Sequence, residues 1–350
     1  MFPHRIRLRG PWEATPLTAT RLDAEGRVHE VDAPLPPAGP MVMPCRWRQA
    51  GWGDFSGRAR FARRFQWVKP LQAQERLWLG CLGADTFARF VLNDELLGEQ
   101  DDPFGPVAFD ITHRVQSRNG LVVEVDCPAD PGAAFLWRDR LGPGGGLWGT
   151  VFLEVRREVS FTELTVEPLW SETRPALRVL GALAGAAQAQ GVNLSLRVGR
   201  EEIHFGPVGS SGNIDLTAPL PTSLQRWQPR GRGEPFLHEL QVDLMDAHMV
   251  LDHHEIPFGL AQIEAGAHEG LVVNGEPHLW PTSYHVTGPL AEAALLDEAA
   301  RSGRLLAGVL PVRPLDQLAA SRREAASRIV ERIKRSTARY PCLVGWEFAP

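Results

Sequence analysis

Residues 91–99 read VLNDELLGE, two short apolar runs joined by the polar pair Asn93-Asp94. Asparagine and aspartate adopt the left-handed backbone that a two-residue hairpin turn requires. The same rhythm of short alternating runs continues outward through Phe61–Trp67, Arg76–Leu82 and Leu121–Val125, where Asn119-Gly120 gives a further turn signal. Strands at this spacing predict a β-sandwich or jelly roll.

A second block of short alternating runs extends from Phe161 to Glu264. Its clearest predicted strands are Leu177–Leu180, Val192–Val198 and His238–Leu244. About a hundred residues of alternating strands fit a small immunoglobulin-like sandwich.

The pattern changes after residue 265. It predicts a helix over 291–300 ending near Gly303, an apolar strand over 305–310 typical of a buried parallel sheet, a helix over 315–336, and a final strand over 342–346. Glu324 and Arg328 form a favourable pair one helical turn apart. The C-terminal segment is therefore expected to be α/β.

Composition excludes several classes of protein. The 350 residues carry 37 Lys+Arg against 42 Asp+Glu, a net charge of −5, which argues against a nucleic-acid partner. No apolar run approaches the roughly 20 residues of a membrane helix, and the N-terminus lacks the apolar core of a secretory signal. The 4 cysteines are scattered, so we expect reduced thiols, a cytoplasmic protein, and no metal or other cofactor.

Seven stretches in order resemble family 2 of the glycoside hydrolases, the β-galactosidase, β-glucuronidase and β-mannosidase group. They are FSGRARFARRF (55–65), VLNDELLGE (91–99), FDIT (109–112), GGLWGTVFL (145–153), WQP (227–229), PFGL (257–260) and LVVNGEP (271–277). The resemblance implies a mainly β fold. Its expected parts are a galactose-binding-like jelly roll (1–158), an immunoglobulin-like β-sandwich (159–265) and a small α/β remnant of a (β/α)8 barrel (266–350).

The predicted barrel segment is too short for the family's chemistry. A retaining glycosidase needs two carboxyl groups roughly 5–5.5 Å apart, and a complete barrel needs at least about 200 residues. Residues after 265 number 350 − 265 = 85. In the family's strand-four pattern the acid/base glutamate would fall one residue beyond Pro350. Glu347 is the one carboxylate near that strand end and is out of register, so it is a weak acid/base candidate, more plausibly a solvated carboxylate.

The resemblance also indicates where a sugar would bind. The family brings an acidic residue into its sugar site on the loop that here contains Trp137, Arg138 and Asp139, and the start of its barrel corresponds to Trp280, Tyr284 and His285. Flat aromatic faces suit a pyranose ring. The alternative for the tryptophans, including Trp52, Trp148 and Trp346, is core packing.

Two acidic clusters raise a metal hypothesis. Asp252-His253-His254-Glu255 lies in a predicted edge strand, where adjacent side chains point to opposite faces, so we favour surface or interface residues. Asp101-Asp102 is read as a solvated turn rather than a calcium site.

Two functions stay open at this point. The favoured one is a non-catalytic carbohydrate-binding or scaffolding relative of the family, without a complete active site. The alternative is an active glycoside hydrolase acting on β-linked sugars through an atypical or partner-completed site. An open barrel fragment would expose strand edges, so we also expect a homo-oligomer or a protein partner to cover it.

Overall fold

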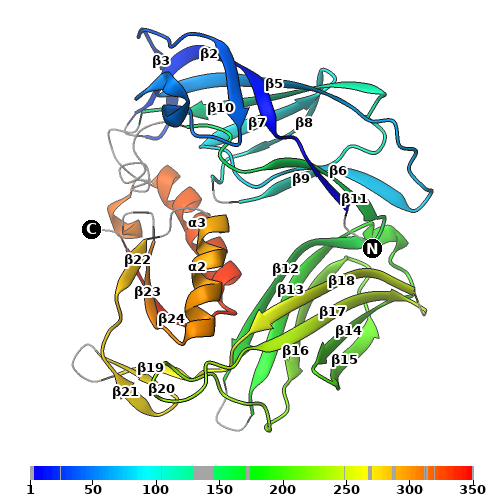
Figure 1. The fold of residues 1–350 in the computed structure, drawn as a ribbon, viewed down its shortest axis with the longest axis vertical. Helices are drawn as coiled ribbons and strands as arrows, with labels where there is room; N and C mark the ends of the chain where they lie inside the picture. The colour runs from blue at the N-terminus through cyan, green and yellow to red at the C-terminus, as the bar shows by residue number, and fades with distance from the viewer. Residues whose placement is uncertain are drawn as a thin grey trace. The chain divides into compact units, whose positions relative to one another are not determined.

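The computed structural model describes residues 4–23, 25–103, 105–129, 145–170, 174–247, 249–266, 270–285, 289–310, 312, 314–318 and 320–348. Contacts divide the chain into two compact units. The first unit comprises residues 1–156, 311–330 and 348–350, and the second comprises 157–310 and 331–347. The mainly β class is confirmed (Figure 1). The division into three domains at residues 158 and 265 stays a prediction.

The first unit contains two antiparallel sheets. The smaller has the order β1 (His4–Arg7), β11 (Val151–Arg157), β6 (Glu75–Cys81), β9 (Val107–Asp110). The larger has the order β3 (Val28–Val31), β2 (Gly10–Leu22), β5 (Gly57–Gln66), β10 (Arg118–Cys127), β7 (Phe87–Leu92), β8 (Glu95–Gln100), and β4 (Gly39–Met43) pairs with β2. A short η1 helix (Arg48–Trp52) follows β4.

Alternation along these strands builds the core of the first unit. On β10, Leu121, Val123 and Val125 are fully buried, and they pack in one cluster with Phe61 of β5 and Leu79 of β6. Residues two apart on a strand share a face, so each strand contributes every second side chain to this core. Both sheets therefore supply the same apolar cluster.

The hairpin predicted at residues 91–99 is confirmed. Strands β7 and β8 are joined by Asn93 and Asp94, whose φ angles are 50° and 68°. Positive φ at both central residues is the requirement of a type I′ turn, which matches the twist of the paired strands.

The turn predicted at Asn119-Gly120 is wrong, because both residues lie inside β10. The Asn119 side chain is buried and bonds backward, accepting from the Gln116 amide at 2.8 Å and donating to the Gln116 carbonyl at 2.6 Å. The amide side chain therefore closes the preceding turn, while Asn119 itself continues the strand.

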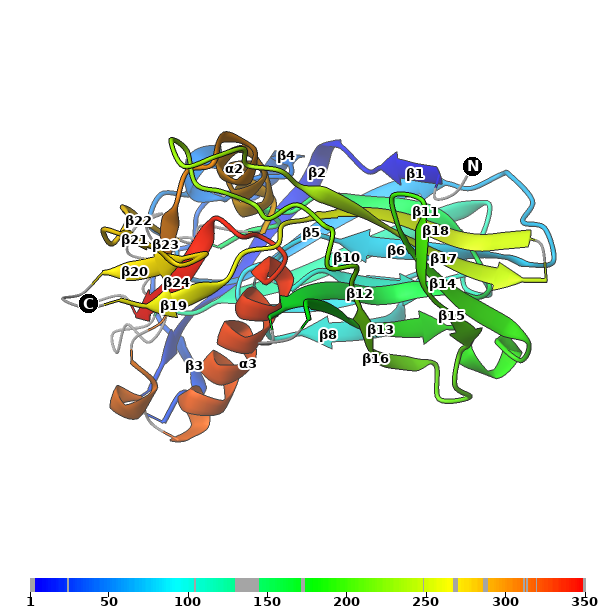
Figure 2. The same cartoon turned by 90° about the horizontal axis from the view of Figure 1, so that it is seen from below.

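Two further sheets in the second unit form the predicted sandwich. One has the order β12 (Ser160–Leu169), β13 (Ala176–Ala184), β16 (Asn213–Pro219), and the other β15 (Glu201–Pro207), β14 (Val192–Val198), β17 (His238–Asp246), β18 (Met249–Phe258). The two sheets enclose one apolar cluster that includes Val179, Leu196 and Val242. Their strands are labelled in Figure 2. A short η2 helix (Ala186–Gln188) follows β13.

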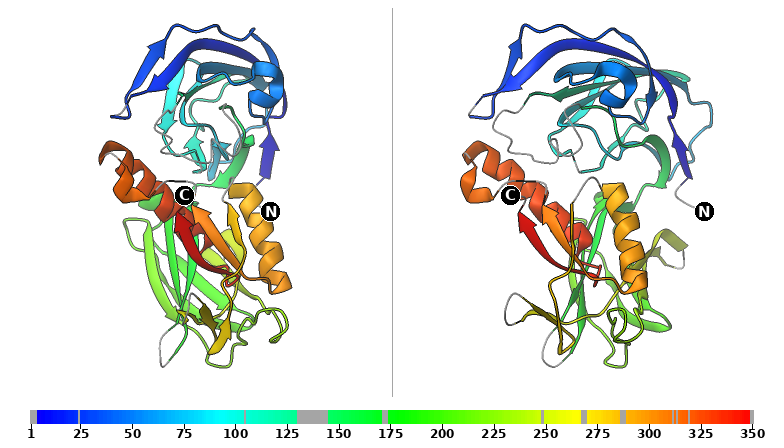
Figure 3. Two further views of the ribbon diagram at one scale, coloured as in Figure 1. Left: turned by 90° about the vertical axis from the view of Figure 1, so that its left-hand side faces the viewer. Right: turned by 60° about the vertical axis from the view of Figure 1, so that its left-hand side comes forward.

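The region after residue 262 begins with a small meander, β19 (Ile263–Ala265), β20 (Leu271–Val273) and β21 (Glu276–His278). A second sheet follows, in the order β22 (Ser283–His285), β23 (Leu306–Leu310), β24 (Leu343–Phe348), with β22 parallel to β23. Helix α2 (Pro289–Ser302) connects β22 to β23 and lies beside the sheet (Figure 3). Every residue of β23 is buried, as the apolar run predicts.

The helix predicted over 315–336 is shorter in the structure. A 3₁₀ turn, η3 (Leu315–Gln317), comes first, and α3 spans Ala320–Thr337. Leu318 between them is extended, with φ −96° and ψ 145°, so the α-helix cannot begin before it. The Glu324–Arg328 pair forms as expected, with 3.2 Å between Oε1 and Nη1.

Two side chains fasten the sandwich to the α/β segment inside the second unit. Trp227 is fully buried, and its indole Nε1 donates to the Ala300 carbonyl of α2 at 2.8 Å. Arg339 donates through Nη1 to the Pro257 carbonyl of β18 at 2.9 Å. These bonds set the position of the three-stranded sheet, on which the candidate site lies.

All four cysteines are free thiols. Cys45 is half-buried, and burial raises its pKa to about 11, while burial raises the pKa of Cys81 and of Cys342 to about 12. Within the part of the chain that the structure describes, no helix has the length and apolar character needed to cross a membrane.

Candidate functional site

Glu347 near the end of β24 is the carboxylate on which the candidate site is built. Its Oε1 accepts a hydrogen bond from the Trp280 indole Nε1 at 2.8 Å, and its Oε2 accepts one from the Ser283 hydroxyl at 3.4 Å. The two donors lie 67 and 64 residues away in the sequence, just before and at the start of β22. The three-stranded sheet therefore unites the two ends of the α/β segment.

A glycine makes the approach of Trp280 possible. A Cβ placed on Gly345 would lie 2.9 Å from Cη2 of the Trp280 ring, closer than real side chains pack. Gly345 and Glu347 are two apart on β24 and share one face of the strand. Trp280 therefore lies across Gly345 with its indole nitrogen directed at the carboxylate, and it remains 43% exposed.

The opposite face of the sheet is occupied by packing. Tyr284 is buried, and its ring centroid lies 6.4 Å from that of Trp346. Trp346 in turn packs on Gly308, where a Cβ would lie 2.4 Å from its ring. Alternation along β22 and β24 thus places Tyr284 and Trp346 away from the face that carries Glu347.

His285 follows Tyr284 in β22, where its backbone pairs with Val309. Its side chain lies outside the described residues, as do Trp137, Arg138 and Asp139. Among the other tryptophans, Trp52 is buried in the core of the first unit, and Trp148 packs on Gly83 beneath Arg46. Of the predicted platforms in the described part of the chain, Trp280 is the one that is exposed beside a carboxylate.

Two hydrogen bonds fix the orientation of the Glu347 carboxylate. Among the described residues its hydrogen-bond partners are the neutral donors of Trp280 and Ser283, and neither is a second carboxylate. Retaining hydrolysis requires a second carboxyl group roughly 5–5.5 Å away. The arrangement instead offers a flat apolar ring beside a fixed hydrogen-bond acceptor, which suits a molecule carrying both C–H faces and hydroxyl groups.

The two histidines of β18, His253 and His254, each contact a carboxylate within the second unit. His253 Nδ1 lies 2.6 Å from Asp243 Oδ1, whose second oxygen accepts from Arg197 at 2.8 Å. His254 contacts Asp252 at 3.4 Å, on the other face of the strand. The hydrogen bond to Asp243 raises the pKa of His253 above its ordinary value, against a smaller opposing effect of burial. Within the described ranges, no three side chains of ligand type gather to hold a metal.

The carboxylates of the Asp101-Asp102 turn also have partners within the protein. Asp101 pairs with Arg328 at 2.6 Å, and the Asp102 carboxylate accepts from the Gly105 amide at 3.1 Å. These contacts keep the acidic turn in internal hydrogen bonds.

Sequence reasoning missed Ser283 and Gly345. Neither carries a motif, because a serine at a strand start and a glycine in a strand are common. The one available signal was the two-residue spacing of Gly345, in the predicted last strand, and Glu347, one residue beyond its end, which places both on one face if the strand continues.

Comparison with known proteins identifies relatives of this fold. A family described as "Glycosyl hydrolase 2 galactose-binding domain-like" matches residues 52–138. A β-galactosidase of Thermoanaerobacter pseudethanolicus is 23% identical over 244 residues, which cover 65% of this chain and 32% of that protein. The chain thus spans about a third of the length of that curated relative.

Solved structures share the fold across nearly all of the chain. Bifidobacterium dentium β-glucuronidase superposes with a TM-score of 0.69 at 17% identity, covering 99% of this chain and 67% of that one. Dictyoglomus thermophilum β-D-mannosidase superposes with a TM-score of 0.73 at 15% identity, covering 98% of this chain and 52% of that one. At these identities the likeness concerns the fold.

Proposed function

We propose that this chain, a member of glycoside hydrolase family 2, is a non-catalytic carbohydrate-binding or scaffolding relative of those enzymes, and that carbohydrate binding is the role its geometry supports better. The observation that carries the proposal is the exposed indole of Trp280 held beside Glu347. The sugar would stack on the Trp280 ring and donate hydroxyl protons to the carboxylate.

The geometry supports binding over turnover. A carboxylate oriented by an indole N–H and a hydroxyl is a fixed acceptor, and neither of these two donors can act as the second carboxyl group of a retaining mechanism. Fixing an acceptor before the ligand arrives reduces the entropy lost on binding.

Titration calorimetry with galactose, glucose, mannose and glucuronic acid tests this function. Trp280→Ala is expected to weaken binding by about tenfold or more, since it removes the stacking surface and one bond to Glu347. Trp280→Phe keeps a ring and should retain part of the affinity. Leu279→Ala is the matched control, because Leu279 is 90% exposed and adjacent, but its aliphatic side chain offers neither a ring nor a hydrogen bond to Glu347. Absence of binding to every sugar, or equal affinity in Trp280→Ala, contradicts the proposal.

The alternative is an active glycoside hydrolase, and the exposure of Glu347 near the end of β24 is the observation that favours it. An exposed carboxyl group beside a sugar could transfer a proton if a partner supplied the second carboxylate. Hydrolysis of aryl β-glycosides by the pure protein, lost in Glu347→Gln, would establish this alternative.

We also propose that a second copy or another protein covers the α/β segment. Leu279 and Trp280 expose apolar surface there, at 90% and 43% of their areas. Light scattering coupled to size-exclusion chromatography tests self-association, and a monomer at every concentration rules out the second copy.

A further inference from the structure

Strands β5 and β10 carry a ladder of opposite charges on their outer face. The register places Arg58 opposite Asp126 and Arg60 opposite Glu124. Both pairs are closed, with 3.2 Å between Arg58 Nε and Asp126 Oδ2 and 2.9 Å between Arg60 Nη2 and Glu124 Oε1. Directly opposed charges of opposite sign stabilise a strand pair.

Toward the other end of the same two strands, the arginines no longer face carboxylates. There the register places Gly120 opposite Arg64 and Arg118 opposite Gln66, so two arginines stand on the same face without a carboxylate across from them. Neither Arg64 nor Arg118 forms an ion pair with any residue that the structure describes. Diagonal positions on a strand pair lie roughly 7–8 Å apart, so the two like charges repel each other.

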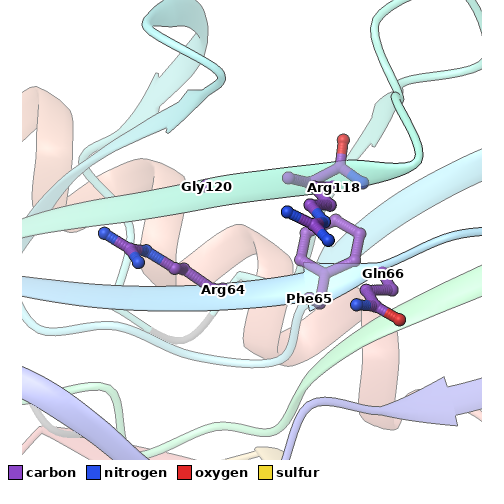
Figure 4. Close-up of a pocket in the computed structure, with 6 residues that line it drawn as sticks. Arg64, Phe65, Gln66, Arg118 and Gly120 are labelled. Atoms are coloured by element: carbon purple, nitrogen blue, oxygen red, sulfur yellow. The ribbon is translucent and has the colours of Figure 1, made fainter.

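A hollow of about 480 Å³ lies at this position. It is lined by Arg64, Phe65, Gln66, Arg118, Asn119 and Gly120, and Figure 4 shows Arg64 projecting from β5 and Arg118 from β10. A Cβ added to Gly120 would meet no atom within 4 Å, so the glycine is not demanded by close packing. It also lacks a positive φ, so its effect is to leave this part of the strand face open.

The backbone that carries Arg118 is held firmly. Asn119 bonds to both the amide and the carbonyl of Gln116, and its Oδ1 also accepts from Asn93 Nδ2 at 3.0 Å. The Gly120 amide donates to Asn93 Oδ1 at 3.0 Å. Arg118 therefore projects from a fixed position, which lowers the entropy cost of binding.

We infer that this hollow binds an oxyanion, the carboxylate or sulfate group of an acidic saccharide or a free inorganic anion of the same kind. Arginine matches planar oxyanions with paired hydrogen bonds, and the two guanidinium groups have no ion pair with the described residues, so an anion can take the place that the carboxylates hold elsewhere on the ladder. This site is independent of the Trp280–Glu347 site, since it lies on the other unit of the chain.

Calorimetric titration of the full chain with glucuronic acid, neutral glucose and inorganic sulfate tests the inference. The double variant Arg64→Gln/Arg118→Gln is expected to weaken anion binding by on the order of tenfold or more, since charged hydrogen bonds are the stronger kind. Arg60→Gln is the matched control, because it removes the same charge from the same strand face but from a closed pair. Gly120→Glu places a carboxylate opposite Arg64 and should abolish anion binding without a clash.

The outcomes distinguish an acidic saccharide from a free anion, and they separate this site from the Trp280–Glu347 site. Glucuronic acid binding more tightly than sulfate identifies an acidic saccharide as the ligand, while equal affinity identifies the free anion, and both support the site. Failure of both anions to bind, or equal affinity in the double variant, overturns it. Trp280→Ala should leave sulfate binding unchanged. A failure of the proposed sugar site at Trp280 and Glu347 would therefore not contradict the proposed anion site.

Discussion

Two carboxylates of the second unit, Asp243 and Glu347, differ in their exposure and in the groups that donate hydrogen bonds to them. Asp243 is 2% exposed and saturated by Arg197 and His253, which can both carry positive charge. Glu347 is exposed and oriented by two neutral donors. A buried carboxylate with cationic partners stabilises the fold. An exposed carboxylate oriented by neutral donors is not neutralised by its partners, so it remains available to interact with a ligand.

The largest expected effect concerns Asp243. Asp243→Ala should lower the free energy of unfolding by about 2 kcal/mol, because it removes two charge-assisted hydrogen bonds from a buried position. Urea denaturation followed by far-UV circular dichroism measures the change. Asp243→Asn keeps an acceptor and should lose less. A loss equal in Asp243→Asn and Asp243→Ala would show that the charge contributes nothing.

Trp280→Ala separates binding from stability. We expect sugar affinity to fall by about tenfold, whereas the free energy of unfolding should fall by less than about 1 kcal/mol, since the ring is partly exposed. Denaturation and calorimetry on the same preparation provide both values. A large decrease in the free energy of unfolding would show that Trp280, like Asp243, mainly stabilises the fold.

His253 gives the comparison a pH dependence. Its pKa is raised in the folded protein, so its favourable contribution is fully present below the unfolded value of 6.5 and is lost as pH rises through the folded pKa. The stability difference between the parent protein and His253→Gln should therefore be about 0.5 kcal/mol larger near pH 5.5 than near pH 9, a small value because the ring is partly solvated. Melting temperatures of both proteins at the two pH values measure this stability difference. A difference that grows with pH would contradict a raised pKa for His253.

The smallest effect is expected at Glu347. Glu347→Gln should change the free energy of unfolding by less than about 0.5 kcal/mol, because the group is exposed and the amide oxygen still accepts from Trp280. Paired urea titrations of this variant and Asp243→Asn give the contrast directly. Comparable losses in the two variants would remove the distinction between the carboxylates.

The fold was predictable wherever neighbouring residues decide it. The Asn93-Asp94 turn follows from residues that accept positive φ, and Gly303, with φ 68°, ends α2 where the pattern predicts. The buried strand β23 follows from its unbroken apolar run. The turn expected at Asn119-Gly120 failed because the Asn119 side chain bonds backward to Gln116, a choice that residue type alone leaves open.

The candidate site was predictable only in part. The sequence, with its resemblance to a known family, indicated Glu347 and Trp280 separately, as a strand-end carboxylate and a possible platform. It did not pair them, because their contact spans 67 positions and depends on β22 and β24 joining one sheet.

The sequence by itself determined the order of strands and helices, since alternation, apolar runs and turn residues act over a few positions. Only the tertiary structure decided which charges meet. The register of β5 and β10 sets Arg60 against Glu124 but Arg64 against Gly120, and a shift of one residue would reverse which side chains face outward. Pairing between distant segments is fixed by the packing of the whole unit, and both proposed binding surfaces of this protein arise from it.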